Sequence, residues 1–284
     1  MALPFAKLHG AGNGYLVIDG RTVERDWLAL AQAMTQHHTG VGSDGLIVVQ
    51  NSSCAQVRMR VINSDGSEAE MSGNGIRLLA KFVLDRGIVA PGPDGLMVET
   101  GSGIRTVWPT WEQGKMAAGR VAMGTPVMTA DDIPVRAPDI PPHGEVRSYP
   151  FEAEGRTLHL TCLAIGNPHA VAFLDEPVDT FPLAEVGPVV QYHPMFPNRI
   201  NFEIVYIRDR DNIQARVFER SEGETLSSGT CSTAAAIAAH LHGHTADQVR
   251  VHLPGGVLEI SWPGQSEAYL DGPVEEVFTG IWPE

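Results

Sequence analysis

The sequence predicts an α/β protein of two similar halves, each a curled sheet around one central helix. Its 30 glycines and 20 prolines recur at short intervals between apolar segments, which is typical of many short strands joined by turns. Two helices begin alike, at residues 71–75 (Met-Ser-Gly-Asn-Gly) and 227–231 (Ser-Ser-Gly-Thr-Cys). Their Ser-Gly steps lie 228 − 72 = 156 residues apart, slightly more than half of the 284-residue chain. We interpret this as an internal duplication; two unrelated helix starts are the alternative.

Apolar periodicity and capping residues predict the individual elements. In chain order we expect a strand at 15–19, a helix at 26–36, a strand at 45–49, helices at 74–86 and 230–241 on either side of a strand at 201–208, and strand again over 268–282. The proline-rich stretch 114–150 is expected to cross between the halves. The predicted N-terminal half therefore covers 1–120, completed by a terminal strand at about 270–284, and the C-terminal half covers 121–269.

The composition excludes several classes of protein. The chain carries 20 Lys and Arg against 34 Asp and Glu, a formal net charge of −14 at pH 7. A negative surface repels nucleic-acid phosphates and anionic membranes, so neither is an expected partner. The sequence has no long apolar run and no signal-peptide core, so a cytoplasmic location is expected. Cys54, Cys162 and Cys231 are too few and too scattered for a disulfide framework.

The two similar helix starts are candidate anion sites. The first turn of a helix has N–H groups without intrahelical acceptors and carries about half a positive charge. Glycines at 73 and 229 let a carboxylate or phosphate approach the backbone closely. Each half thus offers one nest, and two nests suit a small, doubly polar anion. The alternative is that Ser72 and Ser228 are simple helix caps.

Polar side chains gather at predicted strand-to-turn junctions. Amides and one arginine in such places suit the carboxylate and ammonium of an amino acid, although a single Asn in a turn more often serves turn geometry. The residues are Asn13, Asn63, Asn167, His169, Asn201, Glu219 and Arg220.

Seven segments resemble, in order, the motifs of the diaminopimelate epimerase family. They are 7–13 (Lys-Leu-His-Gly-Ala-Gly-Asn), 40–45 (Gly-Val-Gly-Ser-Asp-Gly), 63–68 (Asn-Ser-Asp-Gly-Ser-Glu), 71–77 (Met-Ser-Gly-Asn-Gly-Ile-Arg), 166–169 (Gly-Asn-Pro-His), 219–220 (Glu-Arg) and 223–230 (Gly-Glu-Thr-Leu-Ser-Ser-Gly-Thr). The resemblance covers the whole chain. It implies an α/β (α+β) fold of two pseudo-symmetric domains, each a curled, mostly antiparallel sheet or barrel around a central helix, with the active site between them.

The resemblance also implies an isomerase of lysine biosynthesis that converts LL- to meso-diaminopimelate without pyridoxal phosphate or metal. Two groups on opposite faces of the α-carbon would exchange the roles of base and acid, while the helix starts stabilise the negative charge. The expected partner is a small amino-acid substrate, and a homodimer is one option for assembly. By motif position, Asn13, Asn63, Asn167, Asn201, Glu219 and Arg220 bind substrate, His169 lies beside it, and Gly73, Asn74, Gly229 and Thr230 form the carboxylate nest.

The chain departs from the family at both proton-transfer positions, where Ser72 and Ser228 replace the usual cysteines. A thiol near pKa 8.5 can be activated at a helix start, whereas a hydroxyl becomes a base only when another group takes its proton. His169 could serve one serine. The chain is then a natural variant with other or slower α-proton chemistry, an engineered Cys-to-Ser pair, or a protein in which Cys231 replaces one thiol.

A second departure is Gly45, where family members often carry glutamine or a similar polar residue, so the exact substrate is open. The leading hypothesis is a diaminopimelate epimerase with Ser72 and Ser228 as its catalytic pair. The alternatives are a racemase, dehydratase or lyase of the same fold acting on another small amino acid, and a homologue that binds ligand without turnover.

Overall fold

The computed structural model describes residues 2–220 and 222–283. The chain divides into two compact units. Unit 1 combines Met1–Ala122 with Asp271–Glu284, and unit 2 is Met123–Leu270. Among the described residues, no helix has the length and apolar character needed to cross a membrane.

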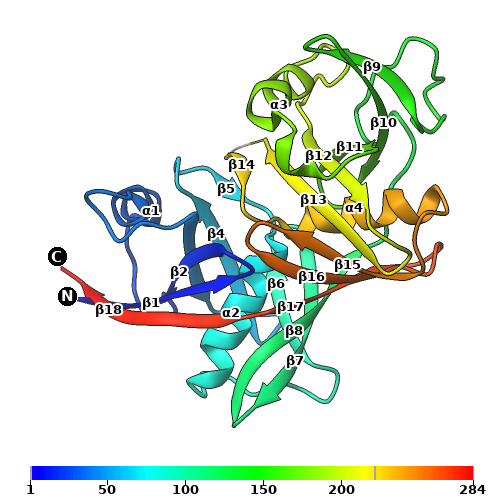
Figure 1. Ribbon diagram of the computed structural model, residues 1–284. Coiled ribbons are helices and arrows are strands. Elements are labelled where there is room, and N and C mark those ends of the chain that lie inside the picture. The colour runs from blue at the N-terminus through cyan, green and yellow to red at the C-terminus, as the bar shows by residue number, and fades with distance from the viewer. Residues whose placement is uncertain (1, 221, 284) are drawn as a thin grey trace. The chain divides into compact units, whose positions relative to one another are not determined.

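Unit 1 is a mixed sheet with the strand order β18-β1-β2-β3-β4-β6-β7-β8 (Figure 1). The β2–β3 and β4–β6 pairs are parallel and the others in this order are antiparallel. The strands are β1 (Leu3–Gly10), β2 (Asn13–Asp19), β3 (Gly45–Gln50), β4 (Val57–Asn63), β5 (Glu68–Ala69), β6 (Leu96–Thr100), β7 (Gly103–Glu112), β8 (Lys115–Gly124) and β18 (Glu275–Trp282). The last strand therefore returns antiparallel to the first.

Helix α2 (Gly73–Asp85) is the central helix of unit 1. It contacts β1, β2, β3, β4 and β7, and every residue from Gly73 to Leu84 is buried. Helix α1 (Trp27–Thr35) packs against β3 and β4 and covers the apolar cluster that includes Leu16 and Leu46. Strands buried on both faces need nearly continuous apolar sequence, which explains the runs at 15–18 and 46–49.

Unit 2 repeats this plan with the strand order β9-β10-β11-β12-β13-β15-β16. The β11–β12 and β13–β15 pairs are parallel. The strands are β9 (Tyr149–Ala153), β10 (Arg156–Ala164), β11 (Pro168–Leu174), β12 (Asn201–Ile207), β13 (Asn212–Glu219), β14 (Gly223–Thr225), β15 (Gln248–Leu253) and β16 (Gly256–Ser261); β17 (Ala268–Pro273) carries the chain from unit 2 back into unit 1.

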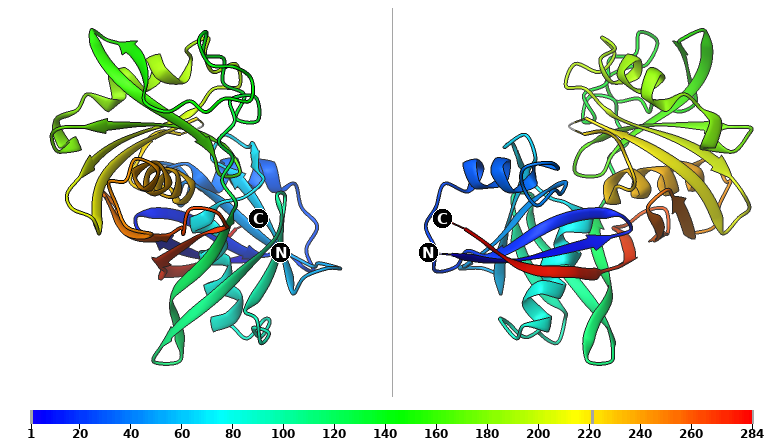
Figure 2. Two further views of the ribbon diagram at one scale, coloured as in Figure 1. Left: turned by 90° about the vertical axis from the view of Figure 1, so that its right-hand side faces the viewer. Right: turned by 60° about the vertical axis from the view of Figure 1, so that its left-hand side comes forward.

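Helix α4 (Gly229–Leu241) is the central helix of unit 2, drawn in gold in Figure 2. It packs against β10, β11, β12, β13, β15 and β16. Residues 231–239 are all buried, and most are alanine, because small side chains let strands approach a helix from several sides. A short 3₁₀ turn (Val178–Thr180) precedes α3 (Leu183–Gln191), which packs against β9, β12, β13 and β14.

The two units share one order of elements, which confirms the predicted α/β class and its pseudo-symmetry. In each unit an antiparallel pair leads into a parallel pair through a helix, and a short hairpin strand precedes the central helix. One ion pair is repeated as well. Arg60 binds Glu68 in unit 1, and Arg216 binds Glu224 in unit 2, both at the 156-residue offset of the two serines.

Sequence reasoning overlooked α3. Gly187 and Pro188 interrupt its pattern, yet the helix continues through both. A Cβ at Gly187 would lie 2.5 Å from the Phe218 ring, so the close packing of this helix on β13 requires glycine. Tertiary packing thus overrides the low local helix propensity.

Candidate functional site

Ser72 is the N-cap of α2. Its Oγ accepts a hydrogen bond from the Gly75 N–H at 3.0 Å, and its own proton is directed to the Tyr15 hydroxyl at 3.5 Å. A Cβ at Gly75 would lie 3.0 Å from the Ser72 Cβ, so the glycine lets the capping side chain fold over the helix start. Ser72 thus caps α2, and the same hydroxyl also makes a hydrogen bond to a phenol.

The amides of unit 1 form a chain beside this helix start. Asn74 donates from Nδ2 to Asn13 Oδ1 at 3.2 Å, and Asn13 donates from Nδ2 to Asp44 Oδ2 at 2.8 Å. Below them, the fully buried Arg77 donates to the Gly73 carbonyl oxygen at 2.8 Å and to Asn74 Oδ1. Burial lowers the pKa of Arg77 to about 9, against a weaker raising effect of Asp271. These contacts fix the orientation of the Asn74 amide.

Tyr15 occupies the space that a side chain at position 45 would need. The two residues are direct partners in the parallel β2–β3 ladder. A Cβ built on Gly45 would lie 2.8 Å from Tyr15 Cε1 and 2.7 Å from the Ile62 carbonyl oxygen. The missing polar side chain at position 45 is thus replaced in space by a phenol ring that reaches Ser72.

Asn63 lies at the end of β4, opposite Gly45. Its Nδ2 donates to Ser67 Oγ at 3.0 Å within its own turn. The hydrogen bond shapes the turn that leads to β5 and α2.

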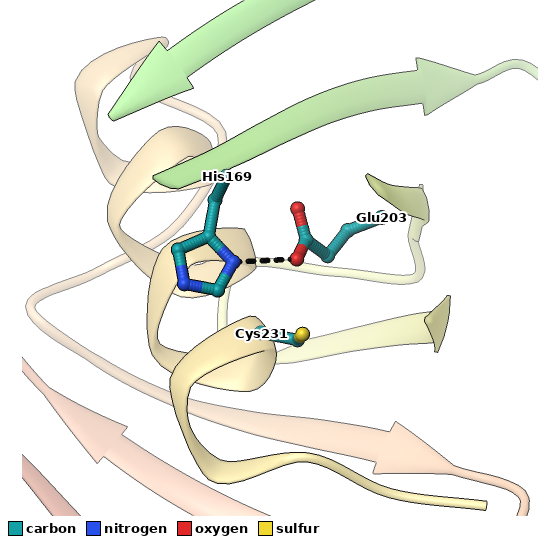
Figure 3. Close-up of side chains that lie close together, drawn as sticks. All are labelled: His169, Glu203 and Cys231. Atoms are coloured by element: carbon teal, nitrogen blue, oxygen red, sulfur yellow. Dashed lines mark hydrogen bonds and ion pairs between the residues drawn. The ribbon is translucent and has the colours of Figure 1, made fainter. Parts of the chain in front are cut away.

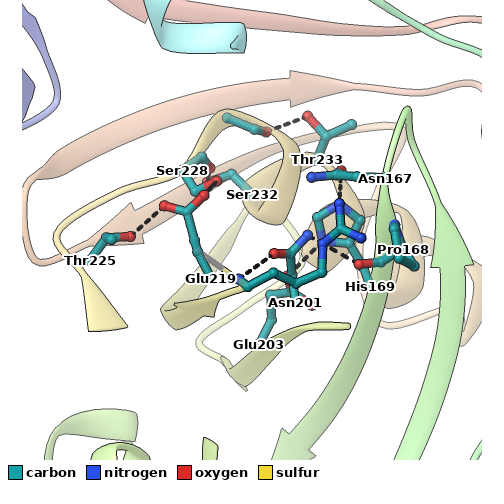
Figure 4. A network of polar contacts seen from close by, with 12 residues as sticks. Asn167, Pro168, His169, Asn201, Glu203, Glu219, Thr225, Ser228, Ser232 and Thr233 are labelled. Atoms are coloured by element: carbon teal, nitrogen blue, oxygen red, sulfur yellow. Dashed lines mark hydrogen bonds and ion pairs between the residues drawn. The ribbon is translucent and has the colours of Figure 1, made fainter. Parts of the chain in front are cut away.

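In unit 2, Ser228 uses its hydroxyl differently. Among the described residues, no side-chain bond from Ser228 caps α4; its Oγ donates instead to Glu219 Oε2 at 3.1 Å. The other carboxylate oxygen of Glu219 accepts from Thr225 Oγ1 at 2.8 Å (Figure 4). Ser228 is only 6% exposed, and the carboxylate beside it is the kind of group that can take a hydroxyl proton.

Asn201 joins the other motif segments of unit 2. Its Nδ2 donates to the Pro168 carbonyl oxygen at 3.1 Å, and its Oδ1 accepts from the Arg220 backbone N–H at 2.9 Å. The buried amide therefore holds the 166–169 turn and the end of β13 together (Figure 4).

His169, Glu203 and Cys231 form a buried cluster under the start of α4 (Figure 3). The imidazole Nδ1 lies 2.7 Å from Glu203 Oε1, and Nε2 lies 2.6 Å from Asn167 Oδ1. Both nitrogens are thus engaged, so His169 positions Asn167. The His169 side chain reaches these two groups, whereas the Ser228 hydroxyl pairs with Glu219.

Cys231 does not suit the role of a replacement thiol. It is fully buried, and desolvation, helped by the nearby Glu203 and Glu219 carboxylates, raises its pKa well above the usual range. Its thiolate is therefore suppressed at neutral pH. The ligand atoms of His169, Glu203 and Cys231 lie within 4.8 Å of one another, a spacing that could hold a metal ion. To bind a metal, however, His169 would have to give up one of its two hydrogen bonds.

Each unit therefore supplies a helix N-terminus with a serine hydroxyl at its start. The serine is hydrogen-bonded to a phenol, Tyr15, in unit 1 and to a carboxylate, Glu219, in unit 2. The helix N-termini include Gly73 and Asn74 in unit 1 and Gly229 and Thr230 in unit 2. Their dipoles favour a bound carboxylate. Sequence reasoning missed Tyr15, Asp44, Thr225 and Glu203 as site residues. Tyr15 beside Gly45 and His169 beside Asn201 occupy matching ladder positions, but this match is visible only in the strand pairing.

A family model described as diaminopimelate epimerase matches residues 5–129 and 161–277. A relative named diaminopimelate epimerase from Pelotomaculum thermopropionicum is 40% identical, over 98% of this chain and 98% of that protein. Another of that name, from Moorella thermoacetica, is 42% identical over 98% of this chain and 99% of that protein.

Among solved structures, a hydroxyproline epimerase from Agrobacterium vitis aligns with a TM-score of 0.71 at 13% identity, covering 99% of this chain and 92% of that one. A phenazine biosynthesis protein of the PhzF family from Bacillus anthracis aligns with a TM-score of 0.69 at 12% identity, covering all of both chains. At such low identity these two structures establish the shared fold alone.

Proposed function

Because this chain belongs to the diaminopimelate epimerase family, we propose that it interconverts LL- and meso-diaminopimelate by transfer of one α-proton, without pyridoxal phosphate. Ser72 and Ser228 deliver and remove the proton on opposite faces of the α-carbon. The backbone N–H groups at the starts of α2 and α4 bind the α-carboxylate and stabilise the negative charge that develops when the proton leaves. The two stereoisomers then differ only in which serine acts first.

The observation that carries this proposal is the bond from Ser228 Oγ to Glu219 Oε2 at 3.1 Å. A serine hydroxyl is too weak an acid to act alone, so it needs a partner that takes its proton. Glu219 supplies that partner, and Thr225 holds the carboxylate in place. We therefore assign Glu219 to proton transfer rather than to substrate binding.

The amides complete the proposed site. Asn13, Asn74 and Asn167 are each held by hydrogen bonds to neighbouring protein groups, so their polar atoms are oriented before a ligand arrives. Preorganised amides suit the ammonium and carboxylate groups of diaminopimelate. Asn201 supports the arrangement by holding Pro168 and Arg220, and Asn63 by shaping the turn before α2.

Deuterium exchange tests the proposal. The protein is incubated in D₂O with LL- or meso-diaminopimelate; NMR then follows α-deuteration and a chiral separation follows inversion. We expect both. Exchange without inversion would identify a one-base enzyme such as a lyase, and binding without exchange would identify a ligand-binding homologue; either outcome contradicts the epimerase proposal.

The double variant Ser72→Cys/Ser228→Cys is the sharper test of the substrate. Thiols at helix N-termini ionise far more readily than hydroxyls. We expect inversion of diaminopimelate to rise by several orders of magnitude. The matched control is Ser53→Cys, an exposed-loop position outside both helix starts, which should leave the rate unchanged. No gain in the double variant would mean that diaminopimelate is not the substrate.

A further inference from the structure

We propose that Tyr15 is the proton-relay partner of Ser72, so that the two faces of the reaction use unlike pairs: a phenol with Ser72 in unit 1 and a carboxylate with Ser228 in unit 2. The inference rests on the proposed function and deepens it. Tyr15 acts through Ser72 and is therefore a positioning residue for proton transfer.

The direct contact is the first support. Ser72 Oγ donates to the Tyr15 hydroxyl oxygen at 3.5 Å while accepting from the Gly75 N–H. The bond from the Gly75 N–H fixes the serine oxygen at the N-terminus of α2. The bond to Tyr15 directs the serine proton to the phenol oxygen. Ser228 is arranged in the same sense, with its proton directed to Glu219 Oε2.

The space around Gly45 is the second support. Tyr15 is only 7% exposed, and its ring occupies the place of a side chain at position 45. The ring is confined between the β2–β3 ladder and Ser72, so it has few alternative rotamers. The absence of a side chain at Gly45 thus makes room for the Tyr15 ring, whose hydroxyl then reaches Ser72.

The internal repeat is the third support. Tyr15 pairs with Gly45 at the start of β3, and His169 pairs with Asn201 at the start of β12. His169 is fully buried and turned to Glu203 and Asn167. The phenol in the matching place is turned to the serine, so the duplicated position has a different use in each unit.

Proton transfer starts from the Tyr15 phenol and the Glu219 carboxylate. On the face served by unit 2, Ser228 Oγ takes the α-proton and gives its own proton to Glu219 Oε2. The C–H electron pair stays on the α-carbon, where the carboxylate and helix dipoles stabilise it. On the other face, Ser72 gives its proton to the carbanion and receives the proton of the Tyr15 phenol. The reverse reaction runs these transfers backward, with the Tyr15 phenolate as the base and the Glu219 carboxyl group as the acid.

Tyr15→Phe removes the phenol oxygen and keeps the ring. Inversion needs both faces, so it should fall by about 100-fold or more in both directions, as expected when an acid–base group is lost. Exchange of solvent deuterium into unreacted substrate needs one face only. It should therefore persist for one of the two stereoisomers, through Ser228 and Glu219, and disappear for the other.

A control variant and the unmodified protein are measured beside Tyr15→Phe. Tyr206→Phe, in β12, is the matched control and should leave inversion and exchange unchanged. Inversion by Tyr15→Phe within about twofold of the starting protein would overturn the inference, as would an equal loss of exchange for both isomers. If the starting protein exchanges neither isomer, the proposed function fails as well, so the two failures are distinguishable.

Rescue by a thiol separates the relay from a packing role. Cysteine at position 72 would not need the phenol, because a thiol at a helix start ionises by itself. The variant Ser72→Cys/Tyr15→Phe should therefore invert at least tenfold faster than Tyr15→Phe. No rescue, in a double variant that still binds diaminopimelate, would mean that Tyr15 contributes packing alone.

Discussion

Gly45→Ala is the most direct test of the packing beside Ser72. The new Cβ would lie 2.7 Å from the Ile62 carbonyl oxygen and 2.8 Å from Tyr15 Cε1. Both distances are far below van der Waals contact, and one neighbour is backbone. Overpacking of this kind costs about 1–3 kcal/mol. At about 2–4 °C per kcal/mol for a chain near this size, the melting temperature should fall by roughly 2–12 °C.

Gly14→Ala, one residue before Tyr15 in the same strand, is the control for this measurement. A Cβ there would find its nearest neighbours at 3.7 and 3.9 Å, which is ordinary contact. Thermal unfolding followed by circular dichroism should show little change for Gly14→Ala. A loss below about 0.5 kcal/mol for Gly45→Ala, or equal losses at the two positions, would refute the packing argument.

Two further predictions concern acid–base and thiol chemistry. Glu219→Gln should lower inversion by about 100-fold or more, because Ser228 loses the carboxylate that takes its proton. Substrate exchange should vanish for the isomer that Tyr15→Phe spares; loss instead for the isomer whose exchange Tyr15→Phe abolishes would contradict the assignment. With a thiol reagent, only the exposed Cys54 should react in the native protein, because burial raises the pKa of Cys162 and Cys231. All three should react in denaturant, and a native Cys54→Ser variant that still reacts rapidly would contradict the burial argument.

The sequence predicted the regular parts of the fold well. The helix expected at 74–86 is α2 at Gly73–Asp85, and that expected at 230–241 is α4 at Gly229–Leu241. Both have strong apolar or Ala-rich patterns that begin at a serine. The repeat at 156 residues correctly indicated two similar halves, because equivalent elements carry equivalent local signals. Helix α3 was not predicted because Gly187 and Pro188 have low helix propensity.

The sequence by itself thus determined the fold class, the duplication, the family resemblance and the loss of both thiols. Tertiary structure decided what surrounds each serine: Tyr15 lies 57 positions from Ser72 and Glu219 lies nine from Ser228, and both contacts depend on how strands meet the central helices. It also placed the Cys231 thiol in the buried cluster with His169 and Glu203. Local patterns encode periodicity and caps, whereas proton-transfer partners are chosen by distance and burial, which only the packed chain provides.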